Sequence, residues 1–219
     1  MILKGFNKQI GEFKLVPLRD CEEDYQICKD IFTNYEIMSK STIFGGDVVK
    51  SEKDMQKIFK LYINTWITNN LGEYKILNKN NDVLGIAGFI ISKKDKNNNA
   101  SVLNFGCYLK KESSISFTSE IIYLLTKFVF KTFQSVREII TYSLESNYTS
   151  QIACFKVKYN LLGKIKYNSK IITYFNFKKK RYDNNYNIVN LPSINKVVQQ
   201  CKECQNIRCN RYFKYLELL

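Results

Sequence analysis

The sequence feature that most restricts the fold is an apolar helical segment between two strand-like segments. Residues Ser116–Phe133 repeat apolar side chains at helical spacing, on a face broad enough for nearly complete burial. Ala100–Leu109 precedes this segment and Arg137–Leu144 follows it, and both are typical of strands. A helix that connects two strands of one sheet in this way forms a crossover between parallel neighbours. We therefore predict a sheet that contains a parallel pair.

The other periodic segments add antiparallel strands and further helices. Val83–Ser92 is expected to pair with Glu73–Leu77 through the turn at Asn78–Asp82, and with Ala100–Leu109 on its other side. We also expect strands over Gln9–Pro17, Leu161–Lys166 and Ile171–Phe177, and helices over Cys21–Asn34, Glu52–Asn69 and Tyr148–Lys158. The predicted fold class is α/β, with a mixed, mainly antiparallel sheet and helices on both faces.

The character of the chain changes near residue 178. The basic run Lys178–Arg181 leads into the asparagine-rich segment Tyr182–Asn190, and the segment after Pro192 has an apolar helical face. We therefore divide the chain into a domain of residues 1–178 and an extension of residues 179–219. The extension is expected to comprise a basic linker and a C-terminal amphipathic helix.

Three cysteines in this extension have a spacing that invites comparison with a metal site. On a helix, Cys201 and Cys204 share one apolar face, whereas Cys209 points away from them. A structural zinc site also needs four ligands, and the extension offers only three. We therefore predict that these thiols are buried, and we predict no metal site.

Composition limits the chemistry of the chain. Its 219 residues include no histidine, which excludes Ser-His-Asp and Cys-His hydrolases and zinc enzymes with histidine ligands. Its longest apolar stretches fall short of the ~20 residues that span a bilayer, and the pattern of Met1–Gly11 predicts no secretory signal. Seven cysteines in such a chain are expected to be reduced thiols. We therefore predict a cytoplasmic protein with no membrane partner.

The net charge of +14 has two explanations. A basic chain attracts RNA, DNA or acidic surfaces and meets them faster. However, the excess of lysine over arginine, together with many asparagines, isoleucines and tyrosines, is also typical of an AT-rich coding sequence. Nucleic-acid sites usually enrich arginine, because its guanidinium group contacts phosphates in a bidentate manner. Charge alone therefore leaves both explanations open.

Several short strings, in their order and spacing, resemble a known family. Phe13–Arg19 reads FKLVPLR, Val83–Gly88 reads VLGIAG and Asn104–Leu109 reads NFGCYL, and Asn147–Ser150 follows the next strand. Together with the order of elements, these strings are similar to the GNAT superfamily of acyl-CoA N-acyltransferases, especially its ribosomal-protein and polyamine N-acetyltransferases. The resemblance covers residues 9–177 and implies a GNAT-like fold for the domain.

The resemblance implies an acetyl-CoA site where two strands of the sheet diverge. The free backbone there would pair with the pantetheine arm, and the N-terminus of the long helix would face the pyrophosphate. The implied binding residues are Cys107, Leu109, Ser114, Ile115, Ser116, Phe117, Thr118, Asn147 and Ser150. The family's glycine-rich phosphate loop is replaced by Lys110–Thr118, which has no glycine, so serine and lysine side chains would contact the phosphates. Asn147 equally suits a simple helix N-cap.

The resemblance also implies that an amine attacks the thioester directly, without a protein-bound acyl intermediate. Because the chain has no histidine, the proton acceptor must be a carboxylate or a water chain that ends on one, and Glu145 is the first candidate and Glu112 the second. The alternative for either residue is a solvated acid in a loop. Tyr108 or Tyr148 is the candidate acid for the leaving thiolate, and backbone amides near Tyr108 would polarise the carbonyl.

The implied function is an acetyl-CoA-dependent N-acetyltransferase that acts on a protein N-terminal amine, a lysine or a small amine. A basic protein would suit an acceptor close to the ribosome or RNA. An alternative of another class is a catalytically silent GNAT scaffold that binds RNA or a protein partner. The missing loop glycines favour this alternative, as does Lys158-Tyr159 where the family has Gly-Phe. A third alternative is an acetyltransferase toxin that acts on charged tRNA.

Overall fold

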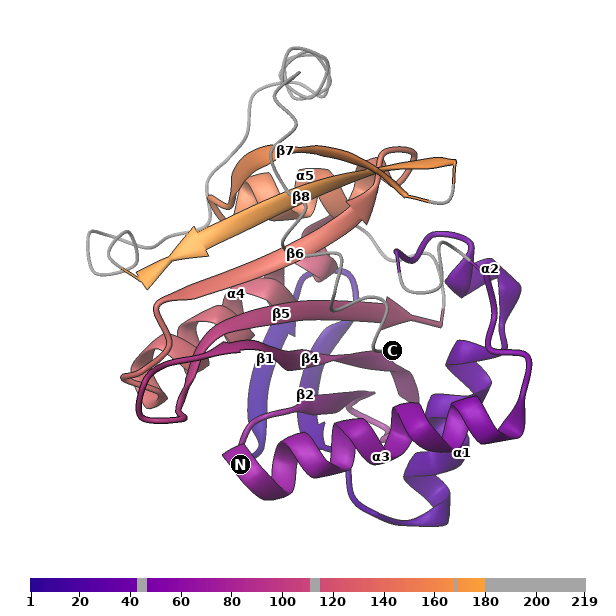
Figure 1. Ribbon diagram of the computed structural model, residues 1–219. Helices are drawn as coiled ribbons and strands as arrows, with labels where there is room; N and C mark the ends of the chain where they lie inside the picture. The colour runs from indigo at the N-terminus through magenta and orange to yellow at the C-terminus, as the bar shows by residue number, and fades with distance from the viewer. Residues whose placement is uncertain (43–46, 111–114, 168, 180–219) are drawn as a thin grey trace.

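The structure is a computed structural model that describes residues 1–42, 47–110, 115–167 and 169–179 (Figure 1). The strands are β1 (Leu3–Asn7), β2 (Gly11–Pro17), β3 (Glu73–Asn78), β4 (Val83–Lys94), β5 (Ala100–Leu109), β6 (Glu138–Leu144), β7 (Asn160–Tyr167) and β8 (Lys170–Lys178). The helices are α1 (Glu22–Phe32), α2 (Tyr35–Met38), α3 (Glu52–Asn69), α4 (Ile115–Thr132) and α5 (Tyr148–Lys156). The linker and helix predicted for the C-terminal extension lie outside the described residues from position 180 onward.

The described strands form one eight-stranded sheet in the order β1-β2-β3-β4-β5-β6-β8-β7. Neighbouring strands are antiparallel except β5 and β6, which run parallel and are connected through α4. The predicted fold class, a mixed and mainly antiparallel α/β sheet, is therefore confirmed. The structure adds that β8 inserts between β6 and β7, an order that the sequence pattern does not determine.

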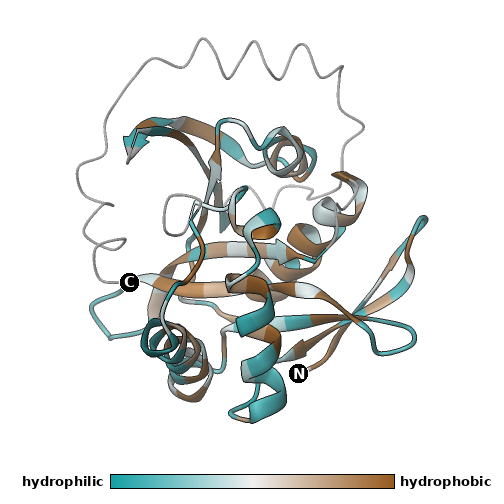
Figure 2. Ribbon diagram, turned by 90° about the vertical axis from the view of Figure 1, so that its right-hand side faces the viewer, coloured by the Kyte–Doolittle hydropathy of each residue, from teal (hydrophilic) through white to brown (hydrophobic). Residues whose placement is uncertain are grey.

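Apolar side chains cover both faces of the sheet. On one face, α4 and α5 pack against inward residues such as Leu15, Phe89 and Phe105. On the opposite face, α1 and α3 pack against Ile86 and Tyr108. The central strands are mostly hydrophobic in Figure 2, whereas the hairpin loops are hydrophilic. The prediction of helices on both faces is thus confirmed.

Two described elements, β1 and α2, are missing from the prediction. In β1 the hydrophobic pattern is reversed, because Phe6 is exposed whereas Asn7 is buried and donates to Ser116 Oγ at 3.2 Å. The α2 helix has only four residues and depends on Asn34, whose side chain accepts hydrogen bonds from two backbone amides. Neither element therefore has the apolar repeat on which a prediction depends.

Helix α5 ends at Lys156, two residues before its predicted end. Lys158 follows with a φ of 64°, the left-handed conformation that favours glycine over any residue with a Cβ. The Lys158→Gly variant is therefore expected to raise the free energy of unfolding by about 0.5 kcal/mol, after the entropy that glycine adds to the unfolded chain. Urea denaturation of both proteins measures the difference. A loss of stability would show that the lysine side chain matters more than the backbone angle.

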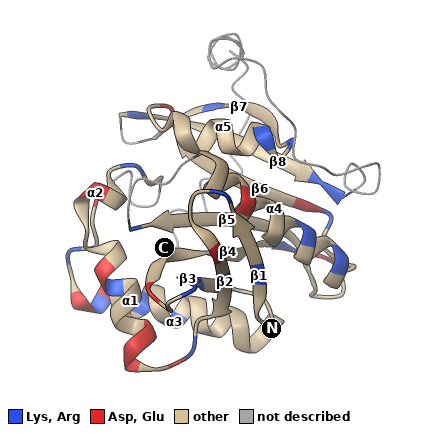
Figure 3. Cartoon of the chain, turned by 180° about the vertical axis from the view of Figure 1, so that it is seen from behind, with Lys and Arg blue, Asp and Glu red and all other residues tan. Residues whose placement is uncertain are grey.

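Charges of both signs are distributed over the described elements. Acidic residues occupy the first turns of α1 and α3 and part of α2, whereas Lys and Arg recur on β7, β8 and α4 (Figure 3). Several elements therefore share the basic excess. Within the part of the chain that the structure describes, no helix has the length and apolar character needed to cross a membrane.

Candidate active site

The sheet opens between β5 and β6. Their parallel pairing runs from Val102 opposite Glu138 to Phe105 opposite Thr141 and then stops. On either side the ladders continue, with β5 paired to β4 as far as Leu109 and β6 paired to β8 as far as Leu144. The two strands therefore diverge, as the resemblance implies, and one edge of β5 along Gly106–Leu109 has no partner among the described strands.

A cavity of about 640 Å³ occupies this divergence. The last residues of β5 and β6 line it, together with the start of α5, the α4 residues Thr118 and Ile122, and the segment Glu36–Thr42 that includes the end of α2. Its lining thus combines strand backbone, hydroxyl and amide side chains and apolar groups, as in many ligand sites.

The structure brings some of the predicted binding residues to this cavity and separates others from it. Cys107, Leu109, Thr118, Asn147 and Ser150 line the cavity. Ile115, Ser116 and Phe117 belong to the first turn of α4 but are not among the described lining residues. Ser114 and the second candidate base, Glu112, lie outside the described residues.

In the first turn of α4, the side chains of Phe117 and Ser116 each have a structural role. Phe117 is buried in the core, where its ring meets the edge of Phe13 at a centroid distance of 5.1 Å. Ser116 is exposed and accepts the hydrogen bond from Asn7 of β1. A ligand at this end of α4 would therefore meet the backbone amides of the helix before the side chain of Phe117.

Asn147 is the N-cap of α5, the role that the sequence left open beside cofactor binding. Its side-chain oxygen accepts from the Ser150 backbone N–H at 3.1 Å, and its Nδ2 donates to the Lys40 carbonyl at 3.0 Å. Asn147 therefore connects two walls of the cavity, the start of α5 and the segment that follows α2.

The candidate catalytic residues differ in position. Glu145 is not among the described lining residues, and its carboxylate forms an ion pair with Lys164 of β7 at 2.6 Å. Tyr108 lines the cavity, but its ring is largely buried against Phe32, and burial raises the pKa of its hydroxyl well above the ordinary value. Tyr148 lines the cavity and is exposed.

The cavity also contains a buried carboxylate that no pattern in the sequence indicates, that of Glu73. Only 1% of this residue is exposed, and its Oε2 atom has no hydrogen-bond partner among the described residues. Burial raises the pKa of Glu73 to about 8, because removal from water disfavours the charged form. Cys28 of α1, Tyr62 of α3, and Cys107 and Tyr108 of β5 are close enough to respond to its charge, and none of them is a cation.

Gly88 makes room for this carboxylate, and Gly106 lies in line with it. Glu73 on β3 is opposite Gly88 on β4, and Gly88 is opposite Gly106 on β5, so the three residues face the same side of the sheet. A Cβ atom at Gly88 would lie 2.8 Å from Glu73 Oε2 and 2.3 Å from the Gly72 carbonyl oxygen. The carboxylate therefore lies over β4, in a space that a side chain at Gly88 would otherwise fill.

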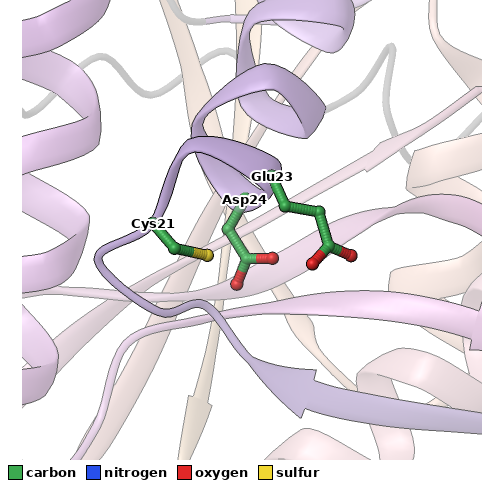
Figure 4. A group of neighbouring side chains, drawn as sticks. All are labelled: Cys21, Glu23 and Asp24. Carbon is green, nitrogen blue, oxygen red and sulfur yellow. The ribbon is translucent and has the colours of Figure 1, made fainter.

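A second cluster of acidic and thiol groups lies away from the cavity. Cys21, Glu23 and Asp24 at the start of α1 bring their ligand atoms within 4.8 Å of one another (Figure 4). However, Asp24 is fully buried and already accepts from Lys75 Nζ at 2.5 Å and from the Arg19 backbone N–H at 2.8 Å. We therefore interpret this cluster as a structural ion-pair network.

A sheet that opens between two parallel strands, with a helix crossing between them, characterises the GNAT acetyltransferase fold, and solved structures with this fold are similar to the chain. One is an acetyltransferase of the GNAT family from Bacillus anthracis, with 14% sequence identity and a TM-score of 0.60. The match covers 82% of this chain and 99% of that chain. The fold of the described domain is therefore that of GNAT-family acetyltransferases.

Two further similar structures contain coenzyme A. Spermidine N-acetyltransferase from Vibrio cholerae, in complex with CoA and spermine, has 14% identity and a TM-score of 0.61, over 78% of this chain and 97% of that chain. A ribosomal-protein alpha-N-acetyltransferase in complex with coenzyme A has 14% identity and a TM-score of 0.59, over 76% and 93%. No protein-family model matches the sequence, and no curated protein sequence matches it.

Proposed function

We propose that the protein is an acetyl-CoA-dependent N-acetyltransferase whose acceptor is a protein N-terminal amine, a lysine or a small amine. The observation that carries this proposal is the divergence of β5 and β6 around a cavity of about 640 Å³. The free edge of β5 suits the amide groups of a pantetheine arm, because an extended chain pairs with an open strand edge.

The surroundings of the cavity also suit acetyl-CoA. The first turn of α4 is near the divergence, and free backbone amides at a helix N-terminus bind phosphate groups without glycine or a dedicated side chain. The similar structures in complex with coenzyme A, one with a polyamine and one named for a ribosomal protein, favour an amine acceptor for this chain as well.

The proposed reaction joins two substrates in one step. The amine nitrogen attacks the thioester carbonyl carbon, the new C–N bond forms, and the C–S bond breaks as coenzyme A leaves. The chain's contribution is to hold both substrates in line, to accept the proton that the ammonium must lose, and to exclude water around the thioester.

Acetyl-CoA binding tests the proposal. Calorimetry with the purified full chain is expected to give a micromolar dissociation constant. The Ser116→Glu variant places a negative charge at the start of α4, near the proposed phosphate site, and is expected to weaken binding by about tenfold or more. Ser116 is exposed, so the substitution removes no apolar contact from the core, and a glutamate oxygen is also able to accept the hydrogen bond from Asn7.

Thr132→Glu is the matched control, because it adds the same charge at the opposite, exposed end of the same helix. Its affinity for acetyl-CoA is expected to equal that of the wild type. Absence of heat and of a thermal shift at millimolar acetyl-CoA would refute the proposed function. Equal weakening in both variants would place the phosphates elsewhere.

A further inference from the structure

The cavity contains two unpartnered hydrogen-bond acceptors on the same face of the sheet. Glu73 Oε2 and Asn104 Oδ1 are both buried and have no partner among the described residues, and both side chains line the cavity. Asn104 precedes Gly106 by two positions on β5, so it lies beside the row of Glu73, Gly88 and Gly106. The pair therefore places two unpartnered acceptor oxygens next to each other in the cavity.

A buried acceptor without a partner costs free energy, and such a group inside a cavity is satisfied when a water or a ligand donates a hydrogen bond to it. Both atoms here are oxygens that accept hydrogen bonds, and one belongs to a carboxyl group. A ligand that satisfies Asn104 Oδ1 and the ionised form of Glu73 must present N–H or O–H donors, and a positive charge stabilises that ionised form. A primary ammonium group has this chemistry.

We infer that Glu73 and Asn104 bind the acceptor amine of the acetyl transfer and that Glu73 is the residue that takes its proton. This inference rests on the proposed N-acetyltransferase function and names the acceptor subsite within it. Glu145, the candidate from the sequence, is paired with Lys164 at 2.6 Å and is not among the described lining residues. Among the described lining residues the carboxylates are Glu73 and the exposed Glu36, so Glu73 is the buried one.

The position of Glu73 suits this role. Its carbonyl oxygen accepts hydrogen bonds from Leu18 N–H at 3.1 Å and from Trp66 Nε1 at 2.7 Å, which fix the backbone from which the side chain extends. The carboxylate lies over Gly88, one strand away from β5, the strand whose free edge would hold the thioester arm. An amine between the carboxylate and this edge would lie next to both the proton acceptor and the thioester carbonyl.

The ammonium group transfers one proton to the ionised Glu73 carboxylate, which gives a neutral amine and a neutral carboxyl group. The nitrogen lone pair then forms the C–N bond as the C–S bond electrons move to sulfur, and a second nitrogen proton ends on that sulfur. Products are the N-acetyl amine and the thiol of coenzyme A, and the carboxyl proton returns to water.

The Glu73→Gln variant tests the inference, because it keeps the shape of the side chain and removes the base. Spermidine and a short peptide with a free N-terminal amine are used as probes, and the better acceptor of the wild type is kept for the comparison. The kcat of the variant is expected to fall by about 10²–10⁴-fold, while its dissociation constant for acetyl-CoA stays within about twofold of the wild-type value. Glu73→Asp, which keeps a carboxylate on a shorter stem, is expected to retain an intermediate kcat.

The exposed Glu22 of α1 provides the control, and Glu22→Gln is expected to leave kcat and acetyl-CoA affinity unchanged. Full activity of Glu73→Gln would overturn the inference and leave the proposed function standing. Acetyl-CoA binding by the wild type without transfer to either probe would also overturn the inference. Failure of the wild type to bind acetyl-CoA would instead refute the proposed function itself.

Discussion

Replacing Lys75 by methionine is expected to lower the free energy of unfolding by about 3–5 kcal/mol. Lys75 on β3 is 5% exposed in its side chain, and its Nζ lies 2.5 Å from an oxygen of Asp24, which is fully buried on α1. The variant leaves the Asp24 charge inside the protein with Arg19 as its one remaining partner among the described residues. Urea denaturation followed by circular dichroism measures the loss.

A double variant separates the cost of the unpaired charge from lost packing. Asp24→Asn combined with Lys75→Met removes both charges and keeps an acceptor for the Arg19 amide, so it is expected to recover at least half of the loss. Lys57→Met removes a lysine from an exposed pair with Asp54 and is expected to change stability by less than about 0.5 kcal/mol. Equal effects of Lys57→Met and Lys75→Met on stability would show that burial of the Lys75–Asp24 pair has no energetic consequence.

The elements that the sequence predicts well are those with a continuous apolar repeat. The predicted ranges of α3 and β5 equal the observed ones, and those of β4, α4 and β6 differ by a few residues at their ends. Apolar burial decides these segments locally, so the pattern suffices. By contrast, β1 is held by pairing with β2 and by Asn7, and α2 by its cap, and both depend on partners distant in sequence or on one polar side chain.

The candidate site also contains residues that the local sequence indicates and residues that only strand pairing brings together. The resemblance predicts the β5 edge and Asn147 as parts of the site, because β5 and the strand before Asn147 are both recognisable in the sequence. Glu73 does not stand out in the sequence, because it is one acidic residue at the start of a predicted strand. Its setting depends on the register that aligns it with Gly88 and Gly106, and this alignment emerges only when β3, β4 and β5 are paired. Two glycines at matching positions of adjacent strands, beside an acidic residue, are the signal that could have found it.

The Glu73→Gln variant is also expected to gain stability relative to the wild type as pH rises. Burial raises the pKa of Glu73 from its ordinary value of 4.5 to about 8. Between these two values the folded wild type holds a proton that the unfolded chain releases, so its stability falls by about 1.4 kcal/mol per pH unit. Glutamine does not titrate, and the advantage of the variant therefore grows by about 3 kcal/mol between about pH 5 and pH 7.5.

Urea denaturation across this pH range measures how the difference in the free energy of unfolding between the two proteins changes with pH. A constant cost of burying the amide does not affect this slope. Glu22→Gln, at an exposed site, is the control and is expected to show no such slope. A constant difference between wild type and Glu73→Gln would mean that the carboxyl titrates normally and is not desolvated. A rising difference, together with lost acetyl transfer, would mean that the protein keeps a destabilising carboxyl group in its cavity. Residues that reduce stability in this way persist where function requires them, and this combination distinguishes a catalytic Glu73 from a structural one.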